Sequence, residues 1–316
     1  MSRTSIVSVR IVALSLSIAA LARTSSAQEH AEHHPRQRAA RDSTARWAAV
    51  DSVLGRKGMM NPGGVMKFSF PRRDLQVTAD GVQLKPALAL GSWIAFADIG
   101  KGQAMMMGDL VLAESEIAPV MSALQKGGVE QSALHNHLVG ETPRVMYMHV
   151  TAHGDPAKLA ATVRDAFGQT ATPMDTASAG GAPAAPFDLD TAAIAKTLGT
   201  HGKVNGGVYQ MSVPRRETVR HDGHVVPPAM GVATALNFQP TSGGKVAATG
   251  DFVMTESEVN PVIRALRDNG ITVTALHQHM LGETPRLYFM HFWANDDAAK
   301  VATGLRAGLD KMAVKK

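Results

Sequence analysis

The residues Ala-Leu-His-Asn-His-Leu-Val-Gly-Glu-Thr-Pro-Arg at 133–144 recur as Ala-Leu-His-Gln-His-Met-Leu-Gly-Glu-Thr-Pro-Arg at 275–286. The offset of 142 residues holds beyond this motif. Segments 108–149 and 250–291 align without a gap and are identical at 22 of 42 positions. The chain is therefore an internal duplication, and residue types that bind metals or ligands are among those that the two copies share.

The duplication predicts two tandem repeats, at 45–167 and 188–312. A chain of 316 residues that is 45% hydrophobic is long enough for two ordinary globular domains. Segment 168–187 is almost wholly Gly, Ala, Pro, Thr and Ser, which predicts a flexible linker. Segment 28–44 is polar and His-containing, which favours a disordered, solvated tail.

Residues 1–27 have the pattern of a secretory signal peptide. Arg3 and Arg10 give a basic start, 11–22 is a short apolar run, and 25–27 offers small residues for cleavage. The run is too short to span a bilayer comfortably, and no later stretch approaches the required ~20 apolar residues. We expect a soluble protein, periplasmic or secreted, without a transmembrane segment.

Charge and cysteine content narrow the possible partners. Cleavage after residue 27 removes three arginines and lowers the formal net charge from +5 to +2. No basic run is interleaved with aromatic residues, so we expect no nucleic-acid partner. The absence of cysteine excludes thiolate metal sites, disulfides and the lipid-bearing cysteine of a bacterial lipoprotein.

The pattern within each repeat predicts an α+β fold. Apolar residues recur at helical spacing over 114–126, which predicts a helix, and Asp155-Pro156 is typical of the start of another. The first helix lies between segments with strand character, and the second follows them. The strand-like segments of the first repeat are 64–70, 75–84, 92–99, 104–112, 130–138 and 144–152, and Asp80-Gly81 predicts a turn within 75–84. The end of this succession is the β-α-β-β-α portion of a ferredoxin-like unit. We expect an antiparallel sheet with helices on one face in each repeat.

The histidines of the motif form a candidate site. Alternate residues of a strand share a face, so His135 and His137 are expected to point the same way. If 130–138 and 144–152 pair as a hairpin, His149 lies roughly opposite Ala133 and three imidazoles converge. The second repeat has the matching set, His277, His279 and His291.

Three neutral imidazoles suit Zn, Mn, Fe, Ni or Cu. The sequence thus predicts one metal or ligand site per repeat. Glu141 and Glu283 would be a fourth ligand or a general base near bound water. Arg144 and Arg286 would hold an anionic small-molecule or envelope ligand, or simply pair with those glutamates.

Other interpretations stay open at this point. The histidines can form a ligand site without metal or a structural polar network. The protein is then a cell-envelope binding module, for example for peptidoglycan or another anionic polymer, or a scaffold in which the two repeats pair with the histidines at the seam. Asp109 and Asp251 are interpreted as capping residues. Pro71-Arg72-Arg73 and Pro214-Arg215-Arg216 form either an anion-binding rim or a salt-bridged strand end, and the second is favoured. Whether the protein is an enzyme is left open.

Several motifs resemble a known family. They are Gly-Arg-Lys-Gly at 55–58, Pro-Arg-Arg-Asp at 71–74, Leu-Gly-Ser-Trp at 90–93, Met-Gly-Asp-Leu-Val at 107–111 and Ala-Leu-His-Asn-His-Leu at 133–138. They are similar to the LppY/LpqO family of exported bacterial envelope proteins with a duplicated domain of unknown function. The resemblance runs over roughly 45–312. It implies an exported envelope protein and no particular reaction, and the missing lipobox cysteine implies a form that is not lipid-anchored.

Overall fold

The computed structural model describes residues 46–175 and 187–315. Both repeats lie within one compact unit that begins at Trp47. The predicted signal peptide and tail, and most of the predicted linker, lie outside the described residues. None of the helices in the described part has the length and apolar character that crossing a bilayer requires.

The first repeat is a six-stranded antiparallel sheet in the order β1-β2-β5-β6-β8-β7. Residues 47–54 are helical and precede it. Its strands are β1 (Met59–Asn61), β2 (Val65–Pro71), β5 (Gly91–Gly100), β6 (Gln103–Ala113), β7 (Glu130–His135) and β8 (Val145–Gly154). Its other elements are the hairpin β3 (Thr78–Ala79) and β4 (Val82–Gln83), and α2 (Pro86–Ala89), η1 (Glu114–Glu116), α3 (Ile117–Lys126) and α4 (Pro156–Phe167).

The second repeat has the same architecture in the order β15-β16-β14-β13-β10-β9. Its strands are β9 (Gly202–Asn205), β10 (Val208–Pro214), β13 (Ala233–Pro240), β14 (Lys245–Met254), β15 (Thr272–His277) and β16 (Tyr288–Asp297). Its other elements are the hairpin β11 (Arg220–His221) and β12 (His224–Val225), and α5 (Thr191–Leu198), η2 (Pro228–Met230), η3 (Ser242–Gly244), α6 (Glu256–Asp268) and α7 (Ala298–Leu309).

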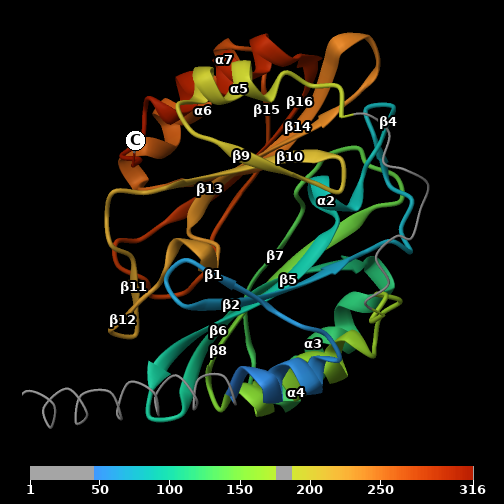
Figure 1. Ribbon diagram of the computed structural model, residues 1–316, viewed down its shortest axis with the longest axis vertical. Helices are drawn as coiled ribbons and strands as arrows, with labels where there is room; N and C mark the ends of the chain where they lie inside the picture. Colours follow the sequence, from blue (N-terminus) through green and yellow to red (C-terminus); the bar gives the residue numbers. More distant parts are fainter. Residues whose placement is uncertain (1–45, 176–186, 316) are drawn as a thin grey trace, which may run out of the picture. The chain divides into compact units, whose positions relative to one another are not determined.

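The predicted α+β class, with helices on one face of each sheet, is confirmed. Helices α3 and α4 cover one face of the first sheet, and α5, α6 and α7 cover one face of the second (Figure 1). Local signals place these elements as expected. Asp155 accepts a hydrogen bond from the Lys158 amide and so caps α4. Asp80 and Gly81 both have positive φ, at 48° and 72°, and form the predicted turn.

One predicted strand is too long. The expected strand 130–138 ends at His135, because the Asn136 side chain donates to the Leu138 carbonyl and starts a turn that Gly140 completes at a φ of 77°. A register shift between Gln131 and Ala133 also interrupts its pairing with β8. His137 therefore lies in a loop, and strand alternation does not determine its direction.

In each sheet, the face that carries no helices packs against the other repeat. One buried apolar cluster joins Val65, Ala95 and Met105 of the first repeat to Phe289 and Met280 of the second. Another joins β3, α2 and β8 to β10 and β14. Burial of apolar side chains from both repeats is the main force that holds these faces together. The histidine motif sits on these same faces.

Candidate metal centre

The six motif histidines of the two repeats lie in a single cluster. The rings in closest contact always come from different repeats: His135 with His277, His137 with His291, and His149 with His279, each at a centroid separation of 3.7 Å. Because each of these pairs has a matching pair under exchange of the repeats, the cluster has pseudo-two-fold symmetry. The two expected sets of histidines, one in each repeat, therefore meet at the seam.

The strands place these rings through their register. His149 on β8 lies opposite Ala133 on β7, as the sequence predicts, and His291 on β16 lies opposite Ala275 in the same way. Reciprocal hydrogen bonds hold the two loops that follow β7 and β15. Ser132 donates to the His279 carbonyl and Thr274 donates to the His137 carbonyl, both at 2.6 Å. Each repeat therefore positions a histidine loop of the other.

Several subsets of this cluster have metal-ligand geometry. The groups whose ligand atoms lie within 4.8 Å of one another are His135/His137/His291, His135/His149/His277, Asp109/His137/His149 and Asp251/His277/His279. Two of these four groups contain residues from both repeats. Among the described residues, no such group contains all three histidines of one repeat, which differs from the predicted grouping. The groups share members, so together they form one centre.

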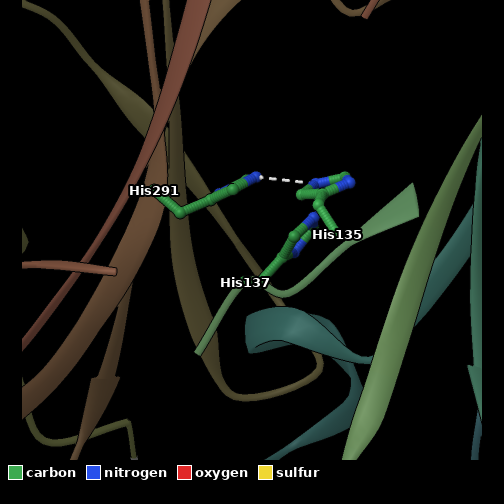
Figure 2. Close-up of side chains that lie close together, drawn as sticks. All are labelled: His135, His137 and His291. Atoms are coloured by element: carbon green, nitrogen blue, oxygen red, sulfur yellow. Dashed lines mark hydrogen bonds between the residues drawn. The ribbon is translucent and has the colours of Figure 1, made fainter. Parts of the chain in front are cut away.

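One distance within the cluster matches metal coordination directly. The Nε2 atoms of His135 and His291 are 3.3 Å apart and form a hydrogen bond, which is the dashed line in Figure 2. Two nitrogens bound to one tetrahedral ion at ~2.0–2.1 Å are themselves about 3.3–3.4 Å apart. Figure 2 also shows His137 beside this pair, on the loop that follows β7. The three side chains therefore approach a common point.

The cluster contains buried nitrogen atoms that lack hydrogen-bond partners. They are His135 Nδ1 and the Nε2 atoms of His137, His149, His277 and His279. His279 Nε2 is 3.0 Å from Asp251 Oδ2 but not in hydrogen-bonding geometry. Buried polar atoms are nearly always paired, so a concentration of unpaired ones marks atoms that are suited to another partner.

Backbone hydrogen bonds orient the imidazoles. His291 Nδ1 donates to the Gly250 carbonyl at 2.8 Å, and His149 is hydrogen-bonded to the backbone at the equivalent Gly108. His279 Nδ1 donates to the Gly231 carbonyl at 3.1 Å. A ring that donates from Nδ1 presents the lone pair of Nε2, which is the arrangement that metal-binding histidines use.

Burial favours the uncharged forms of these side chains. It lowers the pKa of His291 to about 4, and burial together with the neighbouring imidazole of His277 lowers the pKa of His135. Burial also raises the pKa of Asp109, and the charge of Asp251 adds to this effect. Neutral imidazoles can bind a cation without first losing a proton.

Asp109 and Asp251 are the carboxylates of the cluster. They lie on β6 and β14, directly opposite His149 and His291. Their sequence interpretation as capping residues is wrong, because each is in a strand interior and within reach of the histidines. The sequence holds one signal for these residues: an aspartate occurs at the same position in both repeats.

Glu141 and Glu283 lie outside all four groups. Both are buried, and Glu283 accepts a hydrogen bond from the Leu287 amide at 2.8 Å. Arg144 and Arg286 are exposed, and Arg286 Nη1 is 3.8 Å from Glu283 Oε2. The roles assigned to these residues in catalysis and ligand binding stay predictions.

Lys67 makes the centre asymmetric. Its ammonium group lies 3.9 Å from the centroid of the Trp93 ring, and burial lowers its pKa to about 8, opposed by the charge of Asp109. The strand pairing places Gln210 at the equivalent position of the second repeat. Sequence analysis missed this lysine, because a single lysine in a strand carries no motif.

A family described as Domain of Unknown Function (DUF1259) matches the chain twice, over residues 48–169 and 192–311. No curated protein matches the sequence. Two solved structures are similar: a trimeric bacterial microcompartment shell protein PduB (12% identity, 79% of this chain and 87% of that chain, TM-score 0.20) and EtuB from Clostridium kluyveri (10% identity, 80% and 90%, TM-score 0.18). TM-scores of this size do not establish a common fold.

Proposed function

The chain belongs to the family described as Domain of Unknown Function (DUF1259), and we propose that it is a metal-binding protein whose centre is built jointly by its two repeats. The observation that carries this proposal is the convergence of six imidazoles at the seam, five of which have an unpaired, buried nitrogen. Imidazole and carboxylate ligands together suit a divalent transition metal such as Zn, Mn, Fe, Ni or Cu.

In this proposal, His135 and His277 are the central ligands, because they are the equivalent histidines of the two repeats and their rings stack on each other. Asp109 and Asp251 supply carboxylate oxygen at the two ends of the cluster. The bound ion would supply Lewis-acid character and a polarised water. Lys67 would attract an anionic ligand to one side of the centre only.

Metal analysis of protein purified without a histidine tag tests the proposal. We expect at least one tightly bound ion per chain after incubation with the five metals and removal of excess. We also expect a metal-dependent rise in the unfolding temperature. The double variant His135→Ala/His277→Ala should bind at least one ion fewer per chain than the wild type and lose most of this rise. His201→Ala removes an exposed histidine outside the cluster and serves as the control.

The proposal fails if the wild type holds well below one ion per chain with every metal. It also fails if the double variant binds as much metal as the control. Far-UV circular dichroism of the metal-free double variant shows whether it is folded. If it is not, His137→Ala, which removes one ligand from a loop, replaces it in the comparison.

We further propose that the protein is exported, in keeping with the resemblance to the LppY/LpqO family. Residues 1–27 support this through their basic start, apolar run and small residues near the end. Cell fractionation followed by N-terminal sequencing of the mature protein tests it. We expect the protein outside the cytoplasm with a new N-terminus near residue 28. Full-length protein confined to the cytoplasm would contradict the proposal.

A further inference from the structure

A second cluster of ligand-type side chains lies away from the motif histidines. It consists of His153 at the end of β8, His221 on β11, and Asp222 in the turn of the β11–β12 hairpin. One ligand atom from each lies within 4.8 Å of the others. Asp222 Oδ2 is 3.5 Å from His153 Nδ1 and 3.8 Å from His221 Nδ1. His153 comes from the first repeat, and the other two residues come from the second.

His221 is oriented like a metal ligand. Its Nε2 donates to the Leu281 carbonyl at 3.1 Å, which leaves the lone pair on Nδ1, the atom that faces Asp222. The residue is only 7% exposed, and Nδ1 is buried without a hydrogen-bond partner. Asp222 is largely exposed, so the cluster is open to solvent on that side. The site therefore combines a fixed, unpaired nitrogen with access for a cation from solution.

The other repeat provides an internal comparison. The β3–β4 hairpin reaches the second repeat in the same way, and there Asn295 Nδ2 donates to Asp80 Oδ2 at 3.3 Å. Asn295 stands at the position of His153, Asp80 at that of Asp222, Ala79 at that of His221, and Val82 at that of His224. Trp293 Nε1 also donates to Asp80 Oδ2, at 3.5 Å, and no histidine takes part in this contact. The three histidines at the other end are not required by the shared fold.

From this difference we propose that His153, His221 and Asp222 bind a divalent transition metal at a second site, which only one end of the molecule possesses. Two imidazole nitrogens and one carboxylate oxygen suit Zn, Ni or Cu, with the remaining positions filled by water. His224 lies across the hairpin from His221, with its ring centroid 6.0 Å from that of His153, and forms the rim. The ion links the last turn of β8 to the hairpin of the other repeat.

The test replaces three histidines with the residues of the other repeat. The variant His153→Asn/His221→Ala/His224→Val keeps the whole motif cluster and the N-terminal histidines, so their contributions cancel against the wild type. In equilibrium dialysis with zinc, we expect this variant to bind one fewer ion per chain. The metal-free unfolding temperature should stay close to that of the wild type, because the other end of the molecule already has these residues.

Asp222→Asn provides a second variant, since asparagine tolerates the positive φ of 49° at this turn. We expect it to weaken zinc binding at this site at least tenfold. Equal zinc stoichiometry and affinity in the wild type and both variants would overturn the proposal. Repeating the measurement in the His135→Ala/His277→Ala background separates the two sites, because this site should then still bind one ion, whatever happens at the motif cluster.

Discussion

At the residue scale, two glycines support the imidazoles of the seam. Gly108 on β6 and Gly250 on β14 provide the backbone partners of His149 and His291. Both lie where neighbouring strands approach closely. A Cβ at Gly250 would lie 1.9 Å from the Ala235 carbonyl oxygen, which belongs to the paired strand β13. Only glycine allows this strand spacing and the histidine contact together.

We predict that Gly250→Ala lowers the free energy of unfolding by about 3 kcal/mol, because backbone must move. Gly108→Ala should cost less, about 1–2 kcal/mol, because the nearest obstacle, at 2.4 Å, is the flexible end of Ile94, and the nearest backbone atom, the Trp93 carbonyl oxygen, is 2.9 Å away. Denaturant unfolding of the metal-free proteins measures both. An equal or smaller loss for Gly250→Ala would contradict this account of the strand spacing.

At the element scale, a buried ion pair ties the start of α6 to the end of β10. Arg215 Nη1 donates to Glu258 Oε2 at 2.6 Å, and Glu258 also accepts from the amides of Thr255 and Ala313 at 2.7 Å. Arg72 and Glu116 form the same pair in the first repeat. The predicted salt-bridged strand end is thus confirmed, and Glu258 does more than cap its helix.

The pair makes stability depend on pH. The hydrogen bonds from Arg215 and the two amides outweigh burial and lower the pKa of Glu258 below its ordinary 4.5. Its contribution is therefore present above pH 4.5 and lost as pH falls through the lower folded-state pKa. We predict that Glu258→Gln costs about 2 kcal/mol at pH 7, with the difference from wild type shrinking below pH 4.5.

Glu217→Gln is the matched control, because Glu217 contacts the same arginine at 3.0 Å but is 38% exposed. Solvent screens such a pair, so the expected loss is much smaller. Denaturant unfolding between pH 3 and pH 7 compares the three proteins. A loss from Glu258→Gln that is constant over this range would show that its charge is not what stabilises the fold.

Strands β7 and β15 each position the histidine loop of the other repeat through a side-chain hydroxyl group. We predict that Ser132→Ala/Thr274→Ala weakens metal binding about 10–100-fold, as loss of outer hydrogen bonds to a metal site does. Ser132→Thr/Thr274→Ser exchanges the residues of the two repeats and keeps both hydroxyls. It should bind metal like the wild type in isothermal titration calorimetry. Unchanged affinity in the alanine variant would contradict the positioning role.

At the scale of the whole molecule, the two repeats share apolar clusters and the histidine centre. Each repeat alone would expose the seam face, including residues such as Met105 and Phe289 that are fully buried in the whole chain. The histidine cluster would also be divided, because the closest contacts between histidine rings all join one repeat to the other. The apolar seam and the proposed metal centre therefore both require the pair of repeats.

We predict that the two repeats stay together after the chain is cut between them. A protease site introduced within 176–186 would allow cleavage of the folded protein. The two fragments should co-elute on size-exclusion chromatography with the metal content of the uncut protein, because burial of the seam stabilises their association. Fragments that separate as monomers and keep their metal would contradict a shared centre.

Much of the fold could be predicted from local patterns. Helical spacing over 114–126, the Asp155-Pro156 helix start and the Asp80-Gly81 turn all have physical causes within a few residues. The pairing of His149 with Ala133 was predictable too, since a short connection constrains a hairpin. The end of β7 at His135 was not, because it depends on how Asn136 and Gly140 form the following turn.

The duplication, the α+β class and the clustering of histidines within a short motif were all determined by the sequence alone, because they depend on identity and local periodicity. Only the tertiary structure decided that His135 meets His277 of the other repeat as well as the histidines of its own, and that Asp109 and Asp251 join them. Strand periodicity determines which side chains share a face. What that face packs against is decided by apolar burial between residues far apart in the chain.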